Sequence, residues 1–62
     1  MTERHHELFT LVTRNLHDPL RIAFARRVVE GLVYEEASYW LSKADTTRGQ
    51  RAFRILFGIG TY

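Results

Sequence analysis

The sequence has no cysteine and a single proline among its 62 residues. Without cysteine it can form neither a disulfide nor a thiolate metal site, which are the usual supports of very small domains. The lone proline leaves long segments that can become helical. The chain therefore has to fold by packing alone, either within one molecule or against a partner.

Long apolar runs are also missing. The longest uncharged stretch, Ile55–Tyr62, is far shorter than the roughly 20 residues that a membrane-spanning helix requires. The charged start of the chain lacks the apolar segment of a secretory signal. These features predict a cytoplasmic protein with no membrane segment.

The residues that are present favour a folded, interacting protein. An apolar content of 45%, with 13% aromatic residues, is too high for a disordered chain and too high for one small core to cover fully, so we expect a homo-oligomer. Eight of the nine basic residues are arginine, a residue suited to phosphate and carboxylate, which indicates contacts with anions. The arginine codon usage of a GC-rich genome is the alternative explanation.

Apolar residues recur at helical spacing through nearly the whole sequence, which predicts an all-α fold: a compact bundle of four short helices in one domain, residues 1–62. We expect these helices at about 3–16, 19–31, 34–43 and 48–57. The second should be central, since Leu20, Phe24, Val28 and Leu32 form one apolar stripe and Ile22, Ala25 and Val29 form another.

The expected helix boundaries have local signals. Asp18 can cap a helix in which Pro19 is the first residue. Gly31 can end that helix in a left-handed conformation. A polar break, Ser42–Thr47, then precedes the last helix, for which Thr47 and Gln50 form a potential capping box. Gly58 can end this helix, which leaves 59–62 as a short tail.

The last helix sorts its residues into two faces. At about 100° per residue, its apolar residues share one broad arc and its arginines share the opposite side with Gln50. The apolar members are Ala52, Phe53, Ile55, Leu56 and Phe57. The arc is wider than one packing contact needs, so we regard this helix first as a packing element that can also form a dimer.

Residues 27–57 resemble the helix-turn-helix of sigma-factor region 4. The likeness rests on Glu30–Ser38, which reads EGLVYEEAS where that family typically has EGLSYEEIA, and on the arginine-rich helix that follows. Ser42, Lys43 and Val33 depart from the family's pattern, which implies either a turn longer than the standard one or no such turn. The resemblance implies a supporting helix followed by a helix that enters the major groove of DNA.

This resemblance implies a candidate DNA-binding set on the last helix: Arg48, Gln50, Arg51 and Arg54. Arginine and glutamine can read base edges and contact phosphates. We add accessory phosphate contacts from Lys43, Arg26 and Arg27. The alternative interpretation is that these residues form solvated helix faces, with those of the last helix paired with Glu30, Glu35 and Glu36.

Catalysis and metal binding have no support in the sequence. His5 and His6 diverge by about 100° on a helix, and no histidine pair at a spacing of four exists, so we interpret all three histidines, including His17, as exposed. Glu35 and Glu36 diverge in the same way and cannot flank one bond. We expect no enzymatic activity, no cofactor, no metal and no small-molecule substrate.

The sequence therefore predicts a small DNA-binding regulatory protein of helix-turn-helix type, in which a dimer supplies enough contact with double-stranded DNA. The main alternative is a non-enzymatic interaction module, such as an accessory or inhibitory subunit, that binds a protein partner through its aromatic and arginine side chains. A third interpretation places the segment 51–62 flat on an anionic membrane.

Overall fold

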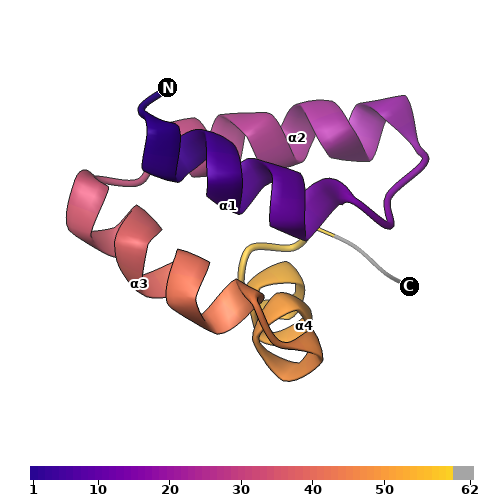
Figure 1. The fold of residues 1–62 in the computed structure, drawn as a ribbon. Coiled ribbons are helices and arrows are strands. Elements are labelled where there is room, and N and C mark those ends of the chain that lie inside the picture. The colour runs from indigo at the N-terminus through magenta and orange to yellow at the C-terminus, as the bar shows by residue number, and fades with distance from the viewer. Residues whose placement is uncertain (60–62) are drawn as a thin grey trace.

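Four helices and no strand make up the described part of the chain, residues 1–59, in the computed structural model (Figure 1). They are α1 (Glu3–Thr13), α2 (Pro19–Glu30), α3 (Tyr34–Ala44) and α4 (Thr47–Leu56). The radius of gyration is 10.2 Å, close to the value of about 10.6 Å for a compact domain of this length. The all-α class and the compact four-helix arrangement are confirmed.

The central helix is α1, and the expectation that the second helix is central was wrong. α1 packs against each of the other three helices, whereas α2 packs substantially only against α1 (Figure 1). Leu8 and Val12 of α1 are fully buried. Of the two apolar stripes on α2, the one with Ala25 and Val29 is buried, and the other leaves Leu20 81% exposed.

The boundary between α1 and α2 follows its predicted signals only in part. Asp18 accepts a hydrogen bond from the backbone N–H of Leu20 at 2.9 Å, and Pro19 is the first residue of α2. α1 ends at Thr13, three residues earlier than expected.

Gly31 does end α2, but its φ of −79° is right-handed, so the helix stops without the left-handed turn that glycine was expected to supply.

Only Asp45 and Thr46 separate α3 from α4, so the turn is shorter than the polar break predicted. The cap of α4 is Thr46, one residue earlier than expected, and its side-chain oxygen accepts a hydrogen bond from the N–H of Gly49 at 2.9 Å. The predicted capping box of Thr47 with Gln50 is therefore replaced by a single side-chain cap.

Gly58 ends α4 as predicted, with a φ of 69° in the left-handed region. The N–H of Ile59 donates to the carbonyl of Arg54 at 2.8 Å and that of Gly58 to Ile55 at 3.3 Å, which is the Schellman arrangement. Ile59 is only 1% exposed and belongs to the core, not to a tail. The rest of the predicted tail, 60–62, lies outside the described residues.

Aromatic side chains join α3 to α4. The ring centroids of Trp40 and Phe53 are 5.4 Å apart, and those of Phe53 and Phe57 are 4.7 Å apart. Trp40 also meets Phe57 edge to face, at 5.7 Å. Such contacts add to the burial of Phe53, which is fully buried, and hold α4 against the bundle.

Candidate nucleic-acid interface

The position of α4 depends on Gly49. This glycine lies against the backbone of Lys43, at the end of α3, so closely that a Cβ atom would overlap the Lys43 carbonyl group and come within 3.0 Å of its Cα. No other residue type fits there without moving the backbone. Gly49 therefore permits the close approach of α4 to α3.

Gln50 is turned into the protein and not toward solvent. Its side chain is 5% exposed, and its amide Nε2 donates a hydrogen bond to the carbonyl of Ala44 at 2.8 Å. That carbonyl belongs to the last residue of α3, where no intrahelical N–H is left to bind it. Gln50 is thus a packing residue that caps α3, and an interface with DNA has to do without it.

Arg54 likewise binds a free carbonyl group, at the carboxyl-terminal end of α1. Its Nε and Nη2 atoms both donate to the carbonyl oxygen of Val12, at 3.1 and 2.8 Å. Val12 lies in the last turn of α1, where unpaired carbonyls and the negative end of the helix dipole favour a cation. Arg54 is half-buried and its guanidinium is held on the Val12 carbonyl, so its main role is structural and it is not free to read bases.

Because of these two contacts, α4 buries a different face from the one that the sequence predicts. Its buried face is centred on Phe53 and includes Gln50, while Ile55 and Leu56 remain 70% and 64% exposed. Polar side chains that satisfy carbonyls at helix ends have displaced apolar ones from the packed side. The predicted apolar arc is therefore split between the core and the surface.

The solvent face of α4 carries two arginines beside apolar residues. Arg48 and Arg51 are exposed, and neither makes an ion pair within residues 1–59. α4 contains no acidic residue. Arg48 lies in the first turn, at the positive end of the helix dipole, where a cation is unfavourable unless an anion binds nearby. This arrangement favours an external anion as the partner of α4.

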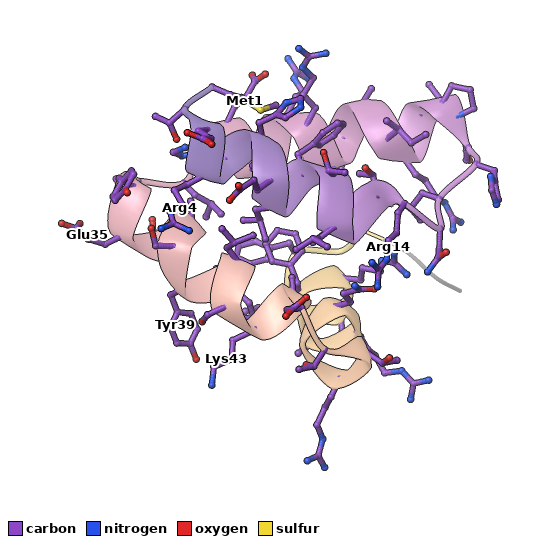
Figure 2. The ribbon with its side chains drawn as sticks, in the orientation of Figure 1. Met1, Arg4, Arg14, Glu35, Tyr39 and Lys43 are labelled. Atoms are coloured by element: carbon purple, nitrogen blue, oxygen red, sulfur yellow. The ribbon has the colours of Figure 1, made fainter. Side chains whose placement is uncertain are left out.

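Lys43 joins Arg48 on one flank of α4. Both line a groove of about 450 Å³ between α3 and α4, together with Tyr39 and Trp40. The Lys43 ammonium lies over the Tyr39 ring, 5.5 Å from its centroid, and Figure 2 shows the two side chains projecting from the same side of α3. The structure thus brings the accessory residue Lys43 to the candidate interface.

Arg51 lies on the other flank. It lines a groove of about 420 Å³ with Asn15, Thr47, Arg54 and Ile55. Neither Asn15 nor the exposed Arg14 beside it, which Figure 2 places at the end of α1, was among the predicted residues. No periodic signal in the sequence connects the end of α1 to α4, because only the tertiary fold brings them together.

The other accessory residues, Arg26 and Arg27, do not share this surface. Both are exposed on α2, which makes no substantial contact with α4. Arg26 Nε also contacts Glu30 Oε1 at 3.1 Å, in an exposed pair along the helix. These two arginines serve as a natural comparison for those of α4.

His5 is buried, so the interpretation of all three histidines as exposed was wrong for this one. It is 7% exposed, and its Nε2 lies 2.7 Å from the carbonyl oxygen of Leu32, just before α3. Since a carbonyl only accepts, Nε2 carries a proton and donates it, and Nδ1 forms a hydrogen bond with the Thr2 hydroxyl. The spacing of His5 with Leu8 and Val12 was the signal for burial, and His5 links α1 to the α2–α3 turn.

Arg4 is engaged at the end of the bundle remote from α4. Its side-chain hydrogen bond to Tyr34 raises the pKa of the guanidinium above its ordinary value, and the charges of Tyr34 and Glu7 act in the same direction. The guanidinium also lies 3.8 Å from the Glu7 carboxylate, and Figure 2 shows it between α1 and α3. Arg4 thus helps to join those two helices.

Other kinds of site find no support in residues 1–59. Those residues contain no group of three histidine or acidic side chains that could hold a metal ion. None of the described helices is long and apolar enough to cross a membrane. The arginines of α4 therefore remain the strongest candidate for function.

Comparison with known proteins identifies one family. A family model described as a domain of unknown function, DUF7680, matches residues 5–59, nearly the whole chain. No curated protein and no solved structure matches the chain significantly. The comparisons therefore assign no activity.

Proposed function

The chain belongs to the DUF7680 family, and we propose that it is a small regulatory protein that binds double-stranded DNA through α4. The observation that carries this proposal is the division of α4 into two sides. One side is held to the bundle by Gly49 and by the buried side chains of Gln50 and Phe53. The other side exposes Arg48 and Arg51, with no acidic residue on the helix.

The flanks of α4 suit the borders of a DNA groove. The major groove is about 12 Å wide and admits one helix, with a phosphate backbone on either side. Lys43 lies on one flank of α4, and Arg51 lies on the other. We propose that Arg48, Arg51 and Lys43 contact phosphates and that Thr47 and Arg48, in the first turn, come nearest the bases. This role agrees with the cytoplasmic location expected from the sequence.

Salt dependence tests the proposal. Fluorescence anisotropy with a labelled duplex should give a slope of log K against log salt of about −2.7, since each neutralised phosphate contributes about −0.9. Affinity should therefore fall about 40-fold between 50 and 200 mM salt. The double variant Arg48→Ala, Arg51→Ala should lose about 1.8 of that slope.

The matched control is Arg26→Ala with Arg27→Ala, which removes the same charge from α2. This control should leave the slope unchanged, because α2 lies away from α4. Equal losses in the two double variants would mean that general charge, and not α4, holds the duplex. Absence of binding at low salt would refute the proposed function.

A second candidate function, a protein-interaction module, is favoured by the exposed Ile55 and Leu56. A surface helix that leaves two large aliphatic residues 70% and 64% exposed offers apolar contacts to a partner. Arginine beside such residues is typical of protein interfaces. Ile55→Ser with Leu56→Ser should abolish capture of a protein partner, and unchanged capture would refute this candidate.

A further inference from the structure

A groove between α1 and α3 has the opposite character to α4. It has a volume of about 660 Å³ and is lined by His6, Glu7, Thr10, Leu11, Leu41, Ser42 and Asp45. Leu11 and Leu41 are half-buried, whereas Glu7 and Asp45 are exposed. The groove therefore combines an apolar floor with carboxylates, a combination that accepts an apolar helix bearing cations.

The exposed face of α4 has the properties that this groove requires. Ile55 and Leu56 supply the apolar part, and Arg48 and Arg51 supply the charge. These arginines make no ion pair within residues 1–59. Asp45 likewise makes no ion pair within residues 1–59. The groove therefore has an unpaired carboxylate, and the exposed face of α4 has unpaired guanidinium groups.

We propose that the protein forms a two-fold dimer in which the exposed face of α4 of each copy occupies the α1–α3 groove of the other. Asp45 lines the groove and is only three residues from Arg48, so the two surfaces adjoin at the turn between α3 and α4. Surfaces that adjoin in one molecule can meet their counterparts across a two-fold axis, and the pair then closes without forming a chain.

The outer stripe of α2 is the competing surface for self-association. Leu20 and Phe24 are 81% and 49% exposed there. The residues that line the α1–α3 groove do not include any residue of α2. We therefore assign the dimer contact to α4 and the groove, because these two surfaces match each other in both apolar and charged groups. Leu20→Ser, which alters only the outer stripe of α2, is the control.

This dimer rests on the second candidate function, the protein-interaction module, and names a second copy of the chain as its partner. It also has a consequence for the proposed binding of DNA. A second copy in contact with α4 covers Arg48 and Arg51, so the duplex and the second copy compete for one surface. DNA should therefore shift the protein from dimer to monomer. Asp45→Lys, which weakens the dimer and leaves α4 intact, should bind the duplex at least as tightly as the unmodified protein.

Sedimentation velocity over a wide concentration range tests the dimer. The unmodified protein should associate, and Asp45→Lys or Arg48→Glu should each weaken association at least about tenfold, because like charges then face each other. Combining both substitutions should restore association, because the charges of residues 45 and 48 are then exchanged and attract each other again across the contact. Leu20→Ser should associate as the unmodified protein does, and circular dichroism should show all variants equally helical.

Three results with the unmodified protein and the single variants would overturn the dimer. They are a monomer at every concentration, association of Asp45→Lys equal to that of the unmodified protein, and loss of association in Leu20→Ser, which would place the contact on α2. Failure to recover association in the folded double variant would likewise refute the proposed pair. A monomer that still binds duplex would leave the DNA proposal standing, and a monomer that captures another protein through Ile55 and Leu56 would leave the second candidate function standing.

Discussion

Replacing Gly49 with alanine should destabilise the protein, although glycine to alanine within a helix ordinarily stabilises by about 1 kcal/mol. The new Cβ would overlap the carbonyl group of Lys43 and reach within 3.0 Å of its Cα. All these atoms belong to the backbone, so α4 has to move away from α3 and loosen the contacts of Phe53 with Trp40. Overpacking of this kind costs about 3 kcal/mol at the upper end of its usual range.

The net loss is therefore about 2 kcal/mol, a large part of the roughly 3–5 kcal/mol that one core of this size supplies. Thermal unfolding followed by circular dichroism should show a Tm lower by about 8–16 °C. The matched control is Gly31→Ala, where φ is −79° and the nearest atoms to a Cβ lie 3.5 Å away. It should be neutral or gain up to about 1 kcal/mol. A Gly49→Ala protein that melts at or above the unmodified Tm would refute the packing argument.

Three further substitutions separate structural residues from surface ones, and urea unfolding measures each. Phe53→Ala should cost about 3–5 kcal/mol, since it opens a cavity beside Trp40 at a fully buried position; a loss below about 1 kcal/mol would contradict that packing. Arg54→Ala should cost about 1–3 kcal/mol by leaving the Val12 carbonyl without its two donors, and Arg54→Lys should recover part of this; unchanged stability would instead show that Arg54 is a free surface residue. His5→Ala should cost about 1–3 kcal/mol, because the Leu32 carbonyl loses its donor, whereas the exposed His6→Ala should have little effect, and equal effects would contradict the role of His5.

The four helices could be predicted from the sequence because their signals are local. Apolar spacing marks the helices, the Asp18–Pro19 pair marks the start of α2, and Gly58 marks the end of α4. Each of these signals acts through backbone groups within one turn, so it survives whatever the helix packs against.

The packing order and the rotation of α4 could not be predicted in the same way. α2 has two apolar stripes, and its sequence alone does not reveal that Ala25 and Val29 are fully buried while Leu20 of the other stripe is 81% exposed. Gln50 and Arg54 look like a polar surface until the carbonyls of Ala44 and Val12 are placed beside them. Of the four principal residues predicted on this helix, Gln50 and Arg54 therefore belong to the interior contacts of the bundle, and only Arg48 and Arg51 are exposed.

The most direct test of the DNA proposal is a titration of ¹⁵N-labelled protein with a short duplex, followed by amide chemical shifts. We expect the largest changes at Thr47, Arg48 and Arg51 of α4 and at Lys43, with the amides of α2 nearly unaffected. Shifts confined to α2, or no shifts at low salt, would contradict the claim that the solvent face of α4 binds DNA.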